Sequence, residues 1–310
     1  MADRSPGAAW AKAGDAEGVI RLQAEHHFSV DDRIDTVEDL CLALIHRRAY
    51  DEAVGMAPGG GRVLDLGCNN GYGTLFLAEA GLHVIGVDVS TKLLDQARSR
   101  SPSHRTRFLA VDGQRLPFAA GSFDLVTSFQ VIEHIADTAP YLGEISRVLK
   151  PGGVAMFSTP NAALRLDPGM TPWNIFHVRE FRAAELQEVL APWFGEVQVR
   201  GLYGEEALYA VERGRVERER ERARREQQRW LPHPWQVRTF VIDAIKKSLP
   251  ESIGERLRGL VREREVRDIA GDPPPPPAPT APLPPFTTRD LFYRSDRTDD
   301  ALDLLAICRV

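Results

Sequence analysis

The segment 62–74 constrains the fold of this chain more than any other. It reads RVLDLGCNNGYGT, an apolar run that enters a turn with three glycines, Gly67, Gly71 and Gly73. Glycine adopts positive φ without strain and carries no Cβ, and a helix that starts at such a turn presents unpaired backbone N–H groups. A strand, a glycine-rich turn and a helix in this order predict an α/β protein that holds a nucleotide-like cofactor at the turn.

The spacing of the glycines separates two classes of cofactor. Turns that bind nicotinamide or flavin dinucleotides have the spacing G-x-G-x-x-G, whereas in this chain Asp65 precedes the first glycine and a wider gap follows it. A carboxylate at that place would repel a pyrophosphate, and it suits a ligand with a cationic amine and no phosphate. S-adenosylmethionine (SAM) has this chemistry through its methionine moiety.

The motif resembles the first motif of the class I SAM-dependent methyltransferases, although Asn69 and Asn70 stand where that family more often has glycine and other small or polar residues. The resemblance implies a Rossmann-like α/β fold, with a seven-stranded, mostly parallel sheet, an antiparallel last strand and helices on both faces. It also implies SAM as the cofactor. The residues predicted to hold it in the first turn are Asp65, Gly67, Asn70 and Gly71.

Acidic residues at the ends of the next two predicted strands extend this pocket. A second apolar run ends at Asp88, followed by Val89, and a carboxylate there can accept hydrogen bonds from two ribose hydroxyls. The alternative is that Asp88 caps the next helix, although Ser90 can do this by itself. After a third run over 107–111, Asp112 and Gly113 are predicted to contact adenine, or else they form an ordinary turn.

A fourth predicted strand over 122–129 leads to the acceptor side, with Gln130, Glu133 and His134. Ligands of open α/β sheets bind at the carboxyl ends of the strands, so these side chains are predicted at the site, Gln130 beside the cofactor. An imidazole can take the proton of an attacking hydroxyl, which makes His134 the candidate general base, and Glu133 and His177 are the other two catalytic candidates. Alternatively, Glu133 and His134 only begin a short helix, and alignment of the substrates supplies the catalysis.

Two further segments bear on the acceptor. The residues after the fourth strand resemble the Glu-x-x-Glu-His pattern of quinone-biosynthesis O-methyltransferases, but Gln130 takes the first position. Loss of that anionic ligand weakens a site for a hard cation such as Mg²⁺, so no metal site is predicted. The segment 174–181 resembles one found in methyltransferases of sugar, glycan and natural-product pathways. Its His177 is predicted either to reach the acceptor or to cap a helix that starts near Arg179.

The C-terminal third is unusual. A predicted sixth strand over 194–203 precedes a dense Arg/Glu run over 212–229, interpreted as a solvated helix, and a stretch over 230–270 that interleaves apolar and basic residues. Residues 211–270 hold 16 basic and 11 acidic side chains, which gives a charge near +5, while the whole chain carries −5. Prolines between 273 and 285 predict a stiff linker. The apolar run 301–310 then predicts the antiparallel last strand.

These features predict a flexible N-terminal segment over 1–34, a methyltransferase domain over 35–203 and 286–310, and a charged helical insertion over 204–285. The stretch 230–270 permits contact with a membrane surface or another protein, and the oligomeric state stays open. Nucleic-acid binding is disfavoured, because the chain is net acidic and shows no recognition module.

The composition favours a cytoplasmic protein. We find no basic-then-apolar leader and no apolar run of about 18 residues. The three cysteines, Cys41, Cys68 and Cys308, are odd in number and scattered, which fits reduced thiols.

The leading hypothesis is an enzyme that moves the SAM methyl group to a small-molecule acceptor, by O-methylation of a sugar or glycan precursor or a natural product. Quinone-type, N- and C-methylation remain alternatives. A catalytically silent SAM-binding interaction protein is an alternative of another class, and an oxidoreductase is opposed by the glycine spacing.

Overall fold

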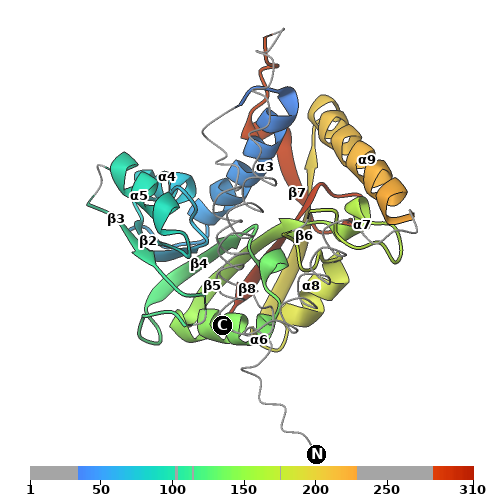
Figure 1. Ribbon diagram of the computed structural model, residues 1–310. Coiled ribbons are helices and arrows are strands. Elements are labelled where there is room, and N and C mark those ends of the chain that lie inside the picture. The colour runs from blue at the N-terminus through green and yellow to red at the C-terminus, as the bar shows by residue number, and fades with distance from the viewer. Residues whose placement is uncertain (1–33, 102–103, 114, 175, 229–281) are drawn as a thin grey trace, which may run out of the picture.

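The computed structural model describes residues 34–101, 104–113, 115–174, 176–228 and 282–310 (Figure 1). The predicted flexible segment up to residue 33, the stretch 230–270 and most of the proline-rich linker lie outside the described residues.

The described strands form one eight-stranded sheet in the order β3-β2-β1-β4-β5-β8-β6-β7. Neighbours among the first five strands pair in parallel, and β8 runs antiparallel between β5 and β6. Figure 1 shows this last strand, in red, between green and yellow ones. The bounds are β1 Arg62–Leu66, β2 His83–Asp88, β3 Thr106–Ala110, β4 Phe123–Phe129, β5 Leu149–Pro160, β6 Glu196–Gly204, β7 Leu291–Arg294 and β8 Asp303–Arg309. The predicted sheet is therefore confirmed in its direction and in its antiparallel last strand.

The sheet has one strand more than predicted. β7 pairs antiparallel with β6 at the edge of the sheet. Its four residues read LFYR, and Leu291 is the one fully buried among them. A run this short, with one buried side chain, lacks the alternation that reveals a strand in a sequence.

Helices precede or follow most strands, and Ser90 caps one of them as predicted. Thr36 and Asp39 form a capping box at the start of α3, and the Ser90 hydroxyl accepts a hydrogen bond at the start of α5. The helices are α3 Val37–Val54, α4 Tyr72–Glu79, α5 Thr91–Arg100, α6 Thr138–Val148, α7 Ala162–Arg165, α8 Ala183–Leu190 and α9 Glu206–Gln228, with 3₁₀ turns η1 Ile132–His134 and η2 Thr288–Asp290.

Strand β8 is buried on both faces of the sheet, and its alternate residues, which point to opposite faces, pack in two different core clusters. In β8, Leu304 and Ala306 pack in the core cluster that contains α6 and α8. Leu305 and Ile307 pack in a second cluster, with α3 and α4. The near-continuous apolar run of this strand follows from that double burial, as expected for strands covered by helices on both sides.

Helix α9 confirms the predicted charged helix but is not fully solvated. Leu208, Val216 and Ala223 are buried on one face of it. Arg220 donates to the Leu164 carbonyl at 3.0 Å, and Arg224 pairs with Asp167. These three buried residues are seven or eight positions apart and most residues after position 211 are charged, so the sequence does not reveal the buried face. Within the described part of the chain, no helix is both long and apolar enough to cross a membrane.

Candidate functional site

The turn after β1 packs closely against the protein's own side chains. Gly67 and Gly71 have φ values of 77° and 83°. A Cβ at Gly67 would lie 2.5 Å from Val131 Cγ2, in the segment that follows β4. Gly73 lies in α4 without a positive φ, and a Cβ there would overlap the ring of Tyr50. The close approach of neighbouring elements therefore requires glycine at positions 67 and 73. This is a second reason for glycine, besides the space for a ligand that the sequence predicted.

Asp65 lies beneath this turn and is fully buried. Its Oδ1 accepts hydrogen bonds from the hydroxyls of Tyr50 at 3.1 Å and Thr127 at 2.9 Å, and its Oδ2 accepts one from Thr74 at 2.6 Å. Burial raises the pKa of this carboxyl, although the three hydroxyl hydrogen bonds oppose the rise. The sequence predicted a carboxylate that faces the ligand, whereas the structure places it where it joins α3, α4 and β4 to the turn.

Asp88 ends β2 beside the same turn. Its Oδ2 accepts a hydrogen bond from the Asn69 backbone N–H at 2.9 Å, and its Oδ1 accepts one from the Ser90 backbone N–H at 2.9 Å. Asn69 has a φ of 52°, uncommon outside glycine, and this hydrogen bond helps to hold it there. Burial raises the pKa of Asp88, opposed by the backbone N–H groups. Ser90, and not Asp88, caps α5.

Val89 and the loop after β3 lie side by side. Gly113 has a φ of 75°, and a Cβ there would lie 3.7 Å from Val89 Cγ1. Asp112 is exposed, and its Oδ1 accepts a hydrogen bond from the Arg115 backbone N–H at 3.2 Å. Asp112 and Gly113 therefore lie next to the residue that follows β2.

Gln130 follows β4 in a left-handed conformation, with a φ of 57°. Its Nε2 donates to Asp303 Oδ2 at 3.0 Å and to the Ser158 hydroxyl at 3.3 Å. Burial raises the pKa of Asp303 well above its usual range, and the Gln130 hydrogen bond opposes the rise. The amide nitrogen of Gln130, the residue predicted beside the cofactor, therefore donates to side chains of β5 and β8.

Glu133 is fully buried in η1, which confirms the short helix that the sequence allowed. Its Oε2 accepts a hydrogen bond from the Thr159 hydroxyl at 2.9 Å, and its Oε1 has no hydrogen-bond partner among the described residues. Its backbone carbonyl accepts from the N–H groups of Val178 and Arg179. The loop before α8 is thereby held against η1.

His134 and His177 meet at this place, from segments more than 40 residues apart. Their ring centroids are 5.0 Å apart, in an edge-to-face arrangement. His134 Nδ1 lies 2.9 Å from the Phe176 carbonyl oxygen. One potential metal-binding atom from each of Glu133, His134 and His177 lies within 4.8 Å of the other two. The structure therefore brings together the three residues predicted as catalytic.

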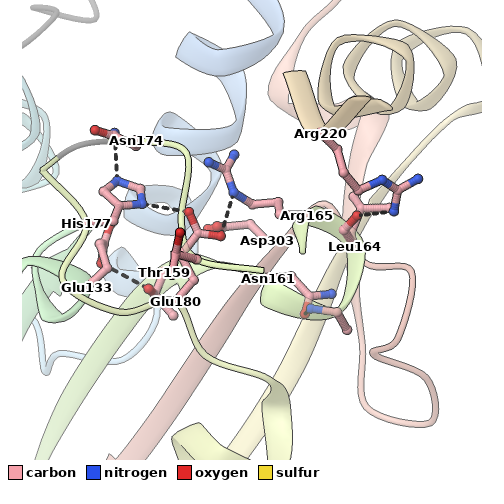
Figure 2. A network of polar contacts seen from close by, with 12 residues as sticks. Glu133, Thr159, Asn161, Leu164, Arg165, Asn174, His177, Glu180, Arg220 and Asp303 are labelled. Atoms are coloured by element: carbon pink, nitrogen blue, oxygen red, sulfur yellow. Dashed lines mark hydrogen bonds and ion pairs between the residues drawn. The ribbon is translucent and has the colours of Figure 1, made fainter. Parts of the chain in front are cut away.

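His177 sits in a chain of polar contacts (Figure 2). Its Nδ1 lies 2.7 Å from Glu180 Oε1, and its Nε2 lies 2.9 Å from Asn174 Nδ2. Glu180 is buried and also accepts a hydrogen bond from Arg165 Nε at 2.8 Å. Burial alone would raise the pKa of Glu180, but the contacts with His177 and Arg165 hold it below its usual value. The predicted capping role of His177 is wrong, because α8 begins only at Ala183.

Sequence reasoning missed four polar residues of this region. Thr159 and Asp303 lie in apolar strands, and Arg165 and Glu180 pair across 15 residues without any periodic relation. The sequence offers one weak signal for Thr159 and Asp303, namely a polar residue inside an otherwise apolar run.

Residues 64–157 match the family model of the methyltransferase domain. A probable S-adenosylmethionine-dependent methyltransferase of Mycolicibacterium smegmatis is 43% identical over 129 residues, which are 41% of this chain and 49% of that protein. A demethylmenaquinone methyltransferase of Beutenbergia cavernae is 39% identical over 132 residues, 42% of this chain and 54% of that protein. The chain thus spans about half the length of these curated relatives.

A solved S-adenosylmethionine-dependent methyltransferase from Mesorhizobium loti has 23% identity and a TM-score of 0.43, over 55% of this chain and 92% of that one.

Proposed function

We propose that this chain, which belongs to the class I SAM-dependent methyltransferases, transfers the methyl group of SAM to an oxygen of a small acceptor molecule. The observation that carries the proposal is the domain match over 64–157, because that range contains both the glycine-rich turn and the segment after β4 with Glu133 and His134. The two segments follow β1 and β4, where the strand order reverses. Ligands of open α/β sheets bind at such a point.

The cofactor contacts are proposed from the strand ends. Each Asp88 oxygen accepts one backbone N–H and has a lone pair left, so it can accept a ribose hydroxyl as well. Asp65 is buried, and we assign it the positioning of the turn. Gln130 is proposed to shape the floor of the pocket through Asp303. The remaining proposed contacts are Gly67, Asn70 and Gly71 for the methionine part of SAM, and Val89, Asp112 and Gly113 for adenine.

The reaction is an in-line displacement. The acceptor oxygen attacks the methyl carbon, the carbon–sulfur bond breaks with its electron pair on sulfur, S-adenosylhomocysteine leaves, and the hydroxyl proton is lost. We place the acceptor oxygen beside Glu133, His134 and His177. His134 donates its Nδ1–H to the Phe176 carbonyl, which makes Nε2 the basic nitrogen of this ring. Positioning of the two substrates supplies a large share of the catalysis.

The acceptor class remains a proposal. A sugar or glycan precursor, or a natural product, is favoured by the resemblance of the segment 174–181. The relative named as a demethylmenaquinone methyltransferase favours a quinone-type acceptor as the second candidate. A hydroxyl acceptor must lose a proton, and the buried polar cluster supplies groups for that step, which is why O-methylation is preferred to N- or C-methylation.

Calorimetric titration with SAM, S-adenosylhomocysteine and NAD⁺ tests the cofactor. We expect binding of the first two and not of NAD⁺, and failure of SAM to bind would end the proposal. Labelled SAM is then incubated with sugar, phenol and quinol acceptors. A labelled product identifies the acceptor class, whereas SAM binding without turnover on any acceptor in a full metabolite extract would favour the silent alternative.

A further inference from the structure

We infer that Glu133, His134 and His177 bind a divalent transition-metal ion of the Zn²⁺ type, and that this ion receives the acceptor oxygen. The role of the ion rests on the proposed function, while the site itself rests on the geometry of the three side chains. The sequence alone predicted no metal site, because Gln130 replaces an anionic ligand. The structure supplies a third ligand from a different segment, the loop that carries His177.

The three side chains converge closely enough for one ion. One potential ligand atom of each lies within 4.8 Å of the other two. Zinc binds histidine nitrogen and carboxylate oxygen at about 2.0–2.2 Å, so two tetrahedral ligands lie roughly 3.4 Å apart. The ligand atoms therefore need to approach by about 1.4 Å at most, which changes in side-chain torsions can provide.

Glu133 carries the strongest sign of a missing partner. Its side chain is fully buried, Oε2 accepts the Thr159 hydroxyl, and Oε1 has no hydrogen-bond partner among the described residues. A buried carboxylate oxygen without a partner is costly to the fold. A cation at this oxygen removes that cost, since buried charges in proteins are paired or coordinate metals.

Both histidines are held in the manner of metal ligands. His134 donates its Nδ1–H to a backbone carbonyl, and His177 donates its Nδ1–H to Glu180 at 2.7 Å. Such a hydrogen bond to a carbonyl or carboxylate fixes the tautomer of a metal-binding histidine and directs Nε2 at the ion. Glu180 is itself fixed by Arg165, as Figure 2 shows. Asn174 Nδ2 lies 2.9 Å from His177 Nε2, so His177 Nε2 is the hydrogen-bond acceptor. A bound ion would replace the Asn174 amide as the partner of this nitrogen.

The donor set indicates which ion binds. Two imidazoles and one carboxylate suit Zn²⁺ and its neighbours in the first transition row, whereas Mg²⁺ prefers oxygen ligands in an octahedron. Three protein ligands leave one position open, as in catalytic zinc sites.

The acceptor hydroxyl would occupy the open position. The bound ion lowers the pKa of that hydroxyl, and its proton leaves to water. The resulting alkoxide attacks the methyl carbon and displaces S-adenosylhomocysteine, so the methyl ether, S-adenosylhomocysteine and one proton are the products. With an ion in place, the Nε2 lone pair of His134 is used for coordination, and deprotonation no longer requires an imidazole base.

Metal binding by the full chain tests the inference directly. The apo protein is dialysed against Zn²⁺, the bound metal is counted, and Co²⁺ is used as a spectroscopic probe of the ligand set. We expect one ion more per wild-type chain than per Glu133→Gln chain, and a visible Co²⁺ spectrum that differs from that of the aquo ion. Glu133→Gln and His177→Ala should bind at least tenfold more weakly, since even the outer partners of metal ligands account for about 10–100-fold.

His83→Ala is the matched control, because His83 is an exposed histidine of β2. It should keep wild-type binding. Thermal melting confirms that each variant is folded; should His177→Ala unfold, the isosteric Glu133→Gln carries the test. Equal metal binding by wild type and Glu133→Gln, or an aquo-like Co²⁺ spectrum, overturns the inference.

SAM titration of the same proteins separates this result from the proposed function. We expect Glu133→Gln to bind SAM as the wild type does. A wild type that binds Zn²⁺ at Glu133 but not SAM would retain the metal site and refute the methyltransferase proposal. If the wild type binds SAM and methylates its acceptor at an undiminished rate in the presence of a chelator, the methyltransferase proposal stands and the role of the metal ion is refuted.

Discussion

Replacing Gly67 by alanine should destabilise the fold through two costs that can be measured separately. The first is backbone strain, because Gly67 has a φ of 77° and a left-handed conformation costs an L-residue about 1–2 kcal/mol. The second is a steric clash, because the new Cβ would lie 2.5 Å from Val131 Cγ2, where ordinary contact begins at 3.4 Å. The Val131 side chain must move by about 0.9 Å, and overpacking of this kind costs about 1–3 kcal/mol.

The total expected loss is about 2–5 kcal/mol, a large part of the ~5–15 kcal/mol that stabilises a domain. Gly60→Ala is the matched control. Gly60 has a φ of 73°, but a Cβ there would meet nothing within 4 Å, so that variant should show the strain alone. In a Val131→Ala background, Gly67→Ala should likewise cost only about 1–2 kcal/mol, and the double-mutant cycle isolates the clash.

Urea unfolding, followed by circular dichroism, measures these free energies. SAM titration of the folded variants reports on the turn itself, and Gly67→Ala should weaken binding more than Gly60→Ala. If the two variants lose the same stability, or if the cycle shows no coupling between positions 67 and 131, the close packing of the turn against the segment after β4 is refuted.

Three further predictions follow from other parts of the molecule. Asp88→Ala should weaken SAM binding about 100-fold, since two hydrogen bonds from ribose at about 1.5 kcal/mol each are lost. Circular dichroism checks that the variant is folded, and unaltered affinity in calorimetry would reject the assignment. Burial, and then the charge of Arg215, lower the pKa of His46 from 6.5 to about 4. Between these two values the unfolded chain binds a proton that the folded chain does not bind. The free energy of unfolding should therefore fall as the pH falls from 6.5 to about 4, by at most about 3 kcal/mol. His46→Gln should flatten this acid limb in denaturation curves from pH 7 to pH 4, and an unchanged slope would contradict the shift. Gly214→Ala should raise the unfolding free energy by about 0.5–1 kcal/mol, because the new Cβ lies inside α9 and meets only Arg218 Nη1, at an ordinary contact distance of 3.4 Å. A loss of stability in urea unfolding would show that the helix is misplaced.

The glycine-rich turn and the strand ends were predictable because their signals are local. Positive φ at Gly67 and Gly71, the cap at Ser90 and the end of β2 at Asp88 depend on a few consecutive residues. The antiparallel last strand was predictable for the same reason, since its apolar run is continuous. The extra strand β7 was not, because its partner β6 lies far away in the sequence and supplies the pairing that its own residues do not announce.

The role of Asp65 shows where local reasoning stops. Its position before the first glycine suggested a carboxylate that faces the ligand. Three hydroxyls, from Tyr50, Thr74 and Thr127, reach it from three different elements and cover it. Only the packing of those elements reveals that the carboxylate supports the turn from below, and Asp65→Ala would therefore test the fold as much as the cofactor.

The sequence alone was enough to predict the class of fold and SAM as the cofactor, because turn chemistry, strand periodicity and the order of the motifs are properties of neighbouring residues. Only the tertiary structure shows how the proposed acceptor site is assembled. His177 approaches Glu133 and His134 because β4 and the loop before α8 end at the same edge of the sheet, a proximity that no spacing along the chain records.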